Sequence, residues 1–157
     1  MSLKKGDTAP HLTLMNDSLE KVDLNFPRNQ HVVLLFFPLA YTSVCTTELC
    51  TVRDERQEYA DLNADVYGIS VDSPFTLQKF KEDHKLPYPL LSDFNKEASR
   101  AYNAIYDNFV FDMKGVSKRA AFVIDKKGVI QYAEVLEDAG QLPNFEEIKS
   151  SLQKLNA

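Results

Sequence analysis

The strongest pattern in the chain is an unbroken apolar run over residues 32–37, which ends at Pro38. Runs of four to eight apolar residues rich in β-branched and aromatic types are typical of buried strands. Residues 66–71 show the same pattern, and residues 89–92 form a shorter version of it. These segments predict three strands of one sheet, with the first of them at its centre.

Two β-hairpins are predicted on either side of these strands. Residues 11–14 and 21–24 alternate between apolar and polar positions, and a turn rich in Asn, Asp and Ser separates them. Residues 120–125 and 129–135 flank a second turn, made of two lysines and a glycine. We expect the first hairpin to cover one edge of the sheet.

Four segments carry apolar residues at helical spacing, so that these residues share one face. Thr42 or Ser43 can cap the first helix, and the Asp-Ser-Pro sequence at residues 72–74 suits the start of the second. Asp93 or Asn95 can cap the third. The four apolar faces are Cys45, Leu49, Val52, Tyr59 and Leu62; Leu77 and Phe80; Phe94, Ala98, Ala101 and Ile105; and, after Pro143, Phe145, Ile148, Leu152 and Leu155.

The order of elements defines the fold class. Hairpin, strand, helix, strand, helix, strand, helix, hairpin and helix follow one another, which is typical of a mixed α/β sheet with helices on both faces. No linker, internal repeat or low-complexity segment indicates a second domain. Residues 1–157 are therefore predicted to form one domain.

Residues 106–118 show no regular pattern. They nevertheless contain the apolar residues Phe109, Val110, Phe111 and Met113. Such a segment can cover the core, form a dimer contact or line a substrate site, and the sequence leaves these alternatives open.

Composition narrows the class of protein. Apolar residues make up 44% of the chain and charged residues 26%, and the net charge of −5 argues against a nucleic-acid surface. No apolar run reaches the length of a membrane span, and the first residues lack the apolar core of a signal peptide, so we expect a cytoplasmic protein. Two cysteines without compact histidine partners make a poor zinc site, and the few glycines form no phosphate-binding loop. We therefore expect neither a metal nor a cofactor.

Cys45 is the residue with the clearest chemical potential. It falls in the first turn of the predicted helix after the central strand, where free backbone N–H groups and the helix dipole favour a negative charge. Such a position favours the thiolate, which is the nucleophilic form of cysteine. The alternative is that Cys45 is a small buried apolar residue, the commoner role of a free cysteine.

The residues around Cys45 resemble the signature of the peroxiredoxin (AhpC/TSA) family. Pro38, Thr42 and Cys45 match its proline, threonine or serine, and cysteine at the right spacing. Glu48 is common at its position in that family, and Arg119, directly before the strand-like sequence AAFVID, matches the family's distal arginine. The resemblance covers nearly the whole chain. It implies a thioredoxin-like fold with an added N-terminal β-hairpin, and a thiol-dependent peroxidase for hydrogen peroxide and small organic hydroperoxides.

The resemblance also implies a role for each of these residues. Cys45 is the peroxidatic nucleophile and becomes a sulfenic acid, while Thr42 offers a hydroxyl to the thiolate or the peroxide. Arg119 supplies a permanent positive charge, and Pro38 shapes and shields the pocket. Glu48 is expected to hold Arg119 through a bidentate ion pair. Without the family match, Thr42 is a helix cap, Arg119 a surface charge and Glu48 a solvated carboxylate.

Cys50 is the second cysteine, five residues after Cys45. Its place resembles that of the second cysteine in the bacterioferritin-comigratory (PrxQ) class, although the FFPLAYT segment resembles the alkyl hydroperoxide reductase E class. In one intact helix the two Cα atoms are ~8.6 Å apart, and a disulfide requires less than ~7 Å. Cys50 can therefore resolve the sulfenic acid as an intramolecular disulfide only if the helix unwinds locally, and we expect residues 46–51 to unwind and Cys50 to resolve Cys45. The alternative is a spectator thiol.

The resemblance further implies a thioredoxin-like reductant and a homodimer, with contacts near Tyr41 and residues 109–113. A different class of function remains open, a non-catalytic redox sensor or binding module, which catalytic turnover with a reductant would exclude. A thiol–disulfide oxidoreductase is the third reading. Its cysteines are usually separated by two residues, whereas four residues separate Cys45 from Cys50, so the sequence argues against it.

Overall fold

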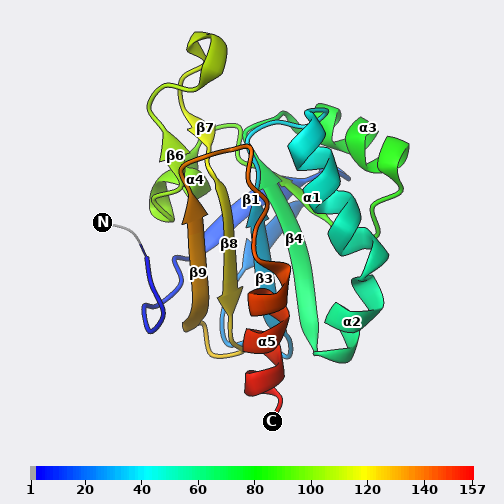
Figure 1. Ribbon diagram of the computed structural model, residues 1–157, viewed down its shortest axis with the longest axis vertical. Coiled ribbons are helices and arrows are strands. Elements are labelled where there is room, and N and C mark those ends of the chain that lie inside the picture. The colour runs from blue at the N-terminus through cyan, green and yellow to red at the C-terminus, as the bar shows by residue number, and fades with distance from the viewer. Residues whose placement is uncertain (1–2) are drawn as a thin grey trace.

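The computed structural model describes residues 3–157 (Figure 1). A seven-stranded mixed sheet lies at its centre, in the order β2-β1-β5-β4-β3-β8-β9. Its strands are β1 (Leu12–Asn16), β2 (Lys21–Leu24), β3 (His31–Phe36), β4 (Ala64–Ser70), β5 (Leu90–Ser92), β8 (Arg119–Ile124) and β9 (Ile130–Leu136). The α-helices are α1 (Ser43–Asp54), α2 (Arg56–Asp61), α3 (Pro74–His84), α4 (Glu97–Ala101) and α5 (Phe145–Leu155). The predicted mixed sheet flanked by helices is confirmed.

β3 is the central strand, parallel to β4 and antiparallel to β8. All residues of β3 and of β8 are buried. A strand that is covered on both faces needs apolar side chains at successive positions, which explains why residues 32–37 do not alternate. The predicted central strand is therefore confirmed, with its start one residue earlier, at His31.

The hairpin of β1 and β2 extends one edge of the sheet. β1 pairs antiparallel with β5, with Met15 opposite Ser92 and Asn16 opposite Leu91, and β2 lies outside β1. The hairpin of β8 and β9 forms the other edge. Both predicted hairpins are confirmed, and the first covers the edge that β5 would otherwise expose.

Alternate side chains of β3 belong to two hydrophobic cores. Val33 and Leu35 lie in the core that α1, α2, α3 and α5 cover, and Val32 and Leu34 lie in the core on the opposite face. The second core includes side chains of α4 and of the N-terminal segment around Ala9. Figure 1 shows α1, α2 and α5 packed in front of the sheet. The reactive residues described below lie at one end of the first core.

The predicted helix after β3 is two helices. α1 ends at Asp54 and α2 begins at Arg56, because Glu55 leaves the helical conformation at φ −105° and ψ 15°. The predicted apolar face is nevertheless correct. Its members Cys45, Leu49, Val52 and Tyr59 are buried in the first core, and Leu62 is partly buried against it.

The predicted helix from Phe94 to Ile105 is wrong in length and partly in its face. α4 is a five-residue helix; Phe94 is 62% exposed before it and Ile105 lies in β6 (Ile105–Tyr106). Lys96 has a left-handed backbone conformation, which prevents an earlier helix start. The N-cap residue is Lys96, so the predicted cap at Asp93 or Asn95 is wrong in position. The carboxylate of Asp93 nevertheless accepts hydrogen bonds from two N–H groups of α4, those of Ala98 and Ser99.

Residues 105–117 form a protrusion at one end of the molecule (Figure 1). β6 pairs with β7 (Val116–Ser117) in a small separate sheet, and the 3₁₀ turn η1 (Val110–Asp112) lies between them. Phe111 is 92% exposed and has a positive φ of 59°. Phe111 and Val110 therefore do not cover the core, although Val116 in the same segment is buried, and a contact surface or a substrate rim is left for these two residues.

The starts of α3 and α5 follow their sequence signals. Ser73 caps α3 by accepting a hydrogen bond from Thr76 N–H, and Pro74 takes the first helical position, as predicted. Asn144 caps α5 in the same way, so Pro143 precedes the cap instead of starting the helix. The predicted apolar face of α5 is confirmed, since Ile148 and Leu152 are fully buried and Phe145 and Leu155 are partly buried.

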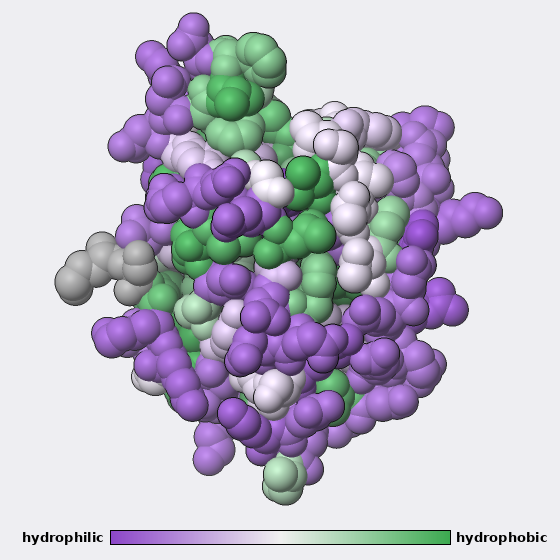
Figure 2. Space-filling model, viewed as in Figure 1, coloured by the Kyte–Doolittle hydropathy of each residue, from purple (hydrophilic) through white to green (hydrophobic). Residues whose placement is uncertain are grey.

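The surface is mainly hydrophilic on the face shown in Figure 2. Apolar residues gather there on the protrusion and near the coil between β9 and α5. Exposed large apolar side chains in these two places are Val110, Phe111 and Leu142. Within residues 3–157, no helix is both long enough and apolar enough to cross a membrane.

Candidate active site

The start of α1 positions Cys45. Thr42 is the N-cap residue, with an extended backbone at φ −90° and ψ 152°, and Cys45 is the third residue of the helix, with no exposed surface. The first helical hydrogen bond runs from Thr46 N–H to the Thr42 carbonyl, 3.0 Å. The N–H groups of Ser43, Val44 and Cys45 therefore precede the helical ladder. They and the helix dipole favour a negative charge at this end of α1.

The side-chain cap that the sequence predicts at Thr42 or Ser43 is absent. Thr42 Oγ1 donates a hydrogen bond to the Leu39 carbonyl, 2.8 Å, and so stabilises the loop before the helix. Thr42 is exposed. Its hydroxyl oxygen retains its capacity to accept hydrogen bonds, while the hydroxyl proton is engaged.

The loop between β3 and α1 is held from the next strand. Pro38 is buried directly after β3 and begins this loop. Asp72, after β4, accepts hydrogen bonds from Ala40 N–H (2.8 Å) and from the Ser70 hydroxyl (2.6 Å). The sequence suggested Asp72 only as part of a helix start. Its bond to Ala40 joins segments far apart in the chain, which no local pattern could reveal.

Arg119 brings a buried positive charge to Cys45. It is the first residue of β8, is 1% exposed, and its Nη2 donates to Cys45 Sγ at 3.2 Å. Its Nε and Nη2 also donate to the Ala139 carbonyl, at 3.1 and 2.8 Å, and its Nη1 donates to Glu48 Oε1 at 2.6 Å. The guanidinium is thus fixed by three partners. The alternative of a surface charge is wrong.

Glu48 pairs with Arg119 through one oxygen only. The predicted bidentate pair is therefore wrong, because Oε2 of Glu48 is buried without a hydrogen-bond partner. Burial raises the pKa of Glu48 to about 7, although the charge of Arg119 and its hydrogen bond act in the opposite direction. Burial also opposes the charge of Arg119, but the charges of Glu48 and Cys45 outweigh it and raise the pKa of the guanidinium.

The carbonyl of Ala139 is a partner that the sequence did not reveal. It lies in the coil between β9 and α5 and accepts two hydrogen bonds from Arg119. A backbone carbonyl carries no residue-type signal, so sequence reasoning could not have found it. The same coil contributes Gly140 and Leu142 to a hollow of about 170 Å³ beside the start of α1, where Ser43 and Val44 also line it.

Cys50 lies about two turns after the start of α1 and does not contact Cys45. Both cysteines are free thiols, and Cys50 is partly exposed whereas Cys45 is buried. α1 is continuous from Ser43 to Asp54, so both residues belong to one intact helix. The structure therefore holds the dithiol state, in which helix geometry keeps the two residues too far apart for a disulfide.

Together these features support thiolate chemistry. A buried sulfur lies at the start of a helix, with a fixed guanidinium 3.2 Å away. Positive charge at this place stabilises a thiolate and also any oxygen anion that leaves from a peroxide next to it. The structure brings Cys45, Arg119 and Glu48 together and places Pro38 and Thr42 in the adjoining loop.

Comparison with known proteins gives consistent matches. The model of the AhpC/TSA family matches residues 5–133. The chain is 38% identical over 130 residues to the peroxiredoxin Bcp of Bacillus subtilis, with 82% of each chain covered. It is 37% identical over 143 residues to a putative peroxiredoxin of Synechocystis, with 85% of this chain and 69% of that protein covered. Among solved structures, the peroxidoxin BcpB of Mycobacterium tuberculosis superposes with a TM-score of 0.87 and 27% identity, covering 99% of both chains.

Proposed function

The chain belongs to the AhpC/TSA family of peroxiredoxins, and from this premise we propose that Cys45 is the thiol with which it reduces hydroperoxides. As a peroxiredoxin, it is a thiol-dependent peroxidase. The single observation that carries the assignment to Cys45 is the 3.2 Å contact between its sulfur and Arg119 Nη2. Cys50 has no such contact with a buried cation.

The proposed first step is nucleophilic attack by the Cys45 thiolate on one oxygen of the peroxide bond. A sulfur–oxygen bond forms, the oxygen–oxygen bond breaks, and the second oxygen leaves as hydroxide or alkoxide and takes up a proton. Cys45 becomes a sulfenic acid. Arg119 stabilises both the attacking thiolate and the departing oxygen, since its charge is permanent and its position is fixed by Glu48 and the Ala139 carbonyl.

Thr42 and Pro38 are proposed to complete the peroxide site. The Thr42 proton is engaged with the Leu39 carbonyl, so its oxygen is free to accept a hydrogen bond from the peroxide O–H. Pro38 carries no N–H and is buried in the same loop, and it is proposed to shape and shield the site.

We propose that Cys50 resolves the sulfenic acid. Its thiol attacks the Cys45 sulfur, water leaves, and an intramolecular disulfide forms. This step requires the middle of α1 to unwind. Three hydrogen bonds support that requirement, because the hydroxyls of Thr46, Thr47 and Thr51 each donate to the carbonyl four residues earlier, at 2.9, 3.0 and 2.7 Å. Such bonds slightly destabilise and bend helices.

A thioredoxin-like reductant is proposed to return the disulfide to the dithiol. We also propose a homodimer that uses the exposed apolar protrusion around Phe111, together with the loop of Tyr41, which is 50% exposed. We also propose a cytoplasmic location, because a reducing compartment returns the proposed Cys45–Cys50 disulfide to thiols.

One equivalent of hydroperoxide, followed by intact mass and thiol counting, tests this function. We expect wild type to lose two thiols as an intramolecular disulfide, Cys50→Ser to stop at a sulfenic acid, and Cys45→Ser to react no faster than a free cysteine. A sulfenic acid that persists in wild type would show that Cys50 is a spectator. Oxidation of Cys45→Ser at the wild-type rate would contradict the assignment of Cys45.

A further inference from the structure

A second concave region lies apart from Cys45, where the end of α1 and α2 meets β4 and the coil before β5. Its cavity measures about 410 Å³, and Tyr59, Tyr67, Tyr88, Pro87 and Pro89 contribute to its walls. Tyr67 is held in place because Arg28 Nη2 donates to its hydroxyl at 3.1 Å. A volume of this size and aromatic walls are typical of a small-molecule site. The peroxidase chemistry described above uses none of these residues.

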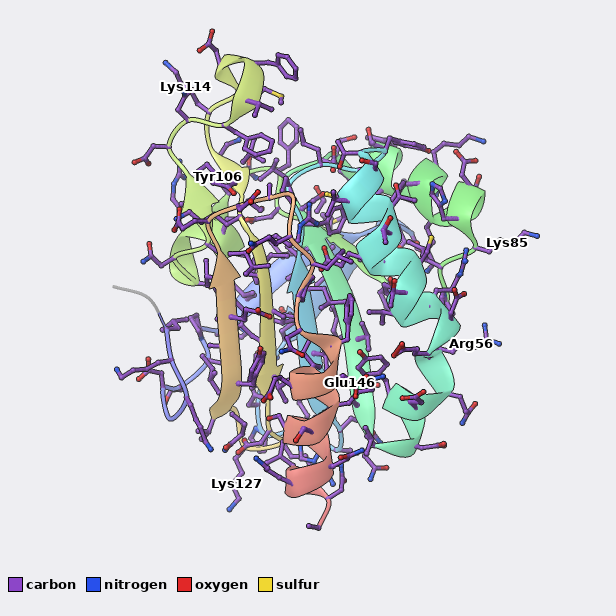
Figure 3. The ribbon with its side chains drawn as sticks, in the orientation of Figure 1. Arg56, Lys85, Tyr106, Lys114, Lys127 and Glu146 are labelled. Carbon is purple, nitrogen blue, oxygen red and sulfur yellow. The ribbon has the colours of Figure 1, made fainter. Side chains whose placement is uncertain are left out.

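Cations gather at one side of this cavity. Arg56 lines the cavity, which also includes Asp65, and with Arg53 and Lys85 it lines an adjoining open hollow, where Asp54 is paired with Arg53. Arg56 and Lys85 are exposed and have no ion-pair or hydrogen-bonding side-chain partner within residues 3–157. Figure 3 shows both side chains projecting from the same edge of the molecule. In a chain with a net charge of −5, unpaired cations at one place favour an anionic ligand.

Cys50 adjoins this cationic edge. It lies three residues before Arg53 in α1, so the two side chains share a face of the helix. The Tyr88 hydroxyl donates a hydrogen bond to the carbonyl of Leu49, the residue before Cys50, at 2.6 Å, so a residue that lines the cavity lies beside this part of α1. Cys50 is also partly exposed, whereas Cys45 is buried. Of the two sulfurs, that of Cys50 is therefore the more accessible from this edge.

The anchors of the cationic edge lie outside the part of α1 that is proposed to unwind. Arg53 Nη1 donates to the carbonyl of His84, at the end of α3, at 2.6 Å. Val52 is buried in the core at 1% exposure. The site at residues 53–56 is therefore expected to persist when residues 46–51 rearrange and the disulfide forms.

We propose that this cavity and its cationic edge bind a low-molecular-weight thiol that carries carboxylates, and that this thiol is a second reductant of the Cys45–Cys50 disulfide beside the thioredoxin-like protein. Arg56 and Lys85 hold the carboxylates, and the tyrosine and proline walls contact the rest of the molecule. The inference rests on the proposed function, since it adds a reductant for that disulfide. A small thiol suits this site because the site is concave and Arg56 and Lys85 are unpaired.

The chemistry consumes two thiols. The first, as its thiolate, attacks the Cys50 sulfur, forms a mixed disulfide with Cys50, and releases Cys45 as a thiolate. The second attacks the sulfur of the bound small thiol, so that a free symmetrical disulfide leaves and Cys50 returns to the thiol. Two small thiols are oxidised and one protein disulfide is reduced, with the protons passing from the small thiols to the two cysteines.

The charge of the small thiol allows a kinetic test, in which the disulfide form of the protein is reduced by a charged and by an uncharged thiol. Reduction rates per thiolate are measured with glutathione, which carries two carboxylates, and with uncharged 2-mercaptoethanol. The variants are Arg56→Gln and Lys85→Gln, and the control is Lys127→Gln, an exposed cation at the turn between β8 and β9, far from both (Figure 3). We expect each variant to lower the glutathione rate about three- to fivefold relative to the 2-mercaptoethanol rate. Lys127→Gln should leave this ratio at the wild-type value.

Two results would overturn the proposal. One is that all three substitutions change the ratio of the glutathione rate to the 2-mercaptoethanol rate equally, or that no substitution changes it. The other is a dependence on Arg56 and Lys85 only when a thioredoxin-type protein is the reductant, which would assign the edge to a protein partner.

Binding to the reduced protein separates this proposal from the peroxidase assignment. S-methylglutathione cannot exchange with a disulfide, so calorimetric titration with it requires no oxidation of Cys45. We expect saturable binding that weakens in Arg56→Gln and at high salt. Absence of binding contradicts the site even if peroxide oxidises Cys45 normally. Normal binding without any reaction of Cys45 with peroxide would instead contradict the proposed function.

Discussion

At the scale of single residues, the account depends on the guanidinium of Arg119. The side chain is buried, and its partners are a thiol, a carboxylate and a backbone carbonyl. A buried cation requires such compensation, because removal from water is costly for an unpaired charge. The contact with Cys45 is therefore built into the fold and does not depend on a flexible surface side chain.

Replacing Arg119 tests its electrostatic role. Arg119→Met keeps much of the length and loses the charge, so we expect oxidation of Cys45 by hydrogen peroxide to slow about 10²–10³-fold, the usual effect of removing one such stabilising donor. Stopped-flow measurement in the Cys50→Ser background isolates this step. Arg28→Met, which removes another partly buried guanidinium, serves as the control. A rate within threefold of the parent would contradict the role of Arg119.

The carboxyl of Glu48 gives a prediction about pH. Its pKa is raised from an ordinary value of 4.5 to about 7, so the folded protein retains a proton that the unfolded chain releases. The protonated carboxyl therefore stabilises the folded protein. This stabilisation is fully present below pH 4.5 and is lost as the pH rises towards 7. Relative to Glu48→Gln, the free energy of unfolding of wild type should fall by up to about 3 kcal/mol over this interval.

Urea unfolding of both proteins at pH 4.5, 6 and 7.5 measures the difference directly. Glu48→Gln keeps the shape of the side chain and does not titrate, so other groups cancel in the comparison. A difference that stays constant, or that grows with pH, would show that the carboxyl is fully ionised in the folded protein.

At the scale of elements, the proposed mechanism gives α1 two purposes. Its first turn holds Cys45 beside Arg119, and its middle is proposed to open so that Cys50 can reach Cys45. Cys45, Glu48 and Leu49 are fully buried, which opposes opening, whereas the threonine hydroxyls bonded to carbonyls four residues earlier favour it. The balance between these effects sets the rate of disulfide formation.

Strengthening α1 should slow the resolving step. Thr47→Ala with Thr51→Ala adds helix propensity of about 0.5 kcal/mol at each position, so disulfide formation after oxidation should slow about fivefold. Rapid-quench thiol alkylation measures the disulfide, and Ser151→Ala in α5 is the control. Unchanged or faster disulfide formation would contradict local unwinding of α1 as the step before resolution.

The sequence predicted elements best where the pattern was long and regular. The central strand, both hairpins and the apolar faces of α1 and α5 are where the periodicity placed them. The failures have local causes that periodicity does not record, namely the break at Glu55 and the left-handed Lys96 that shortens α4. At the site, spacing and family resemblance identified Cys45 and Arg119, but the single-oxygen pairing of Glu48 and the role of the Ala139 carbonyl depend on tertiary contacts.

At the scale of the whole molecule, the protrusion between β6 and β7 is the least explained surface. It exposes Phe111 almost completely and Val110 to 54%. Apolar side chains gathered at the end of a protrusion are typical of a protein contact. This surface lies at the same end of the molecule as the start of α1 (Figure 1), so a contact here would border the peroxide site.

Substitution of Phe111 tests the proposed homodimer. Phe111→Glu should weaken self-association at least about tenfold, since exposed aromatic anchors often dominate such contacts. Phe94→Glu is a matched control, because Phe94 is also exposed, at 62%, but lies outside the protrusion. Sedimentation velocity over a range of concentrations gives the monomer–dimer equilibrium. Equal effects of the two substitutions, or a monomeric wild type, would contradict this contact.

The rate at which Cys45 reacts with hydrogen peroxide shows directly whether this site activates the thiol. The Cys50→Ser protein is mixed with peroxide at pH 7, and sulfenic acid is trapped and quantified by mass over time. We expect a second-order rate constant at least about 10³-fold above that of free cysteine, from the combined effect of the helix start and Arg119. A rate equal to that of free cysteine would contradict the claim that this site activates Cys45.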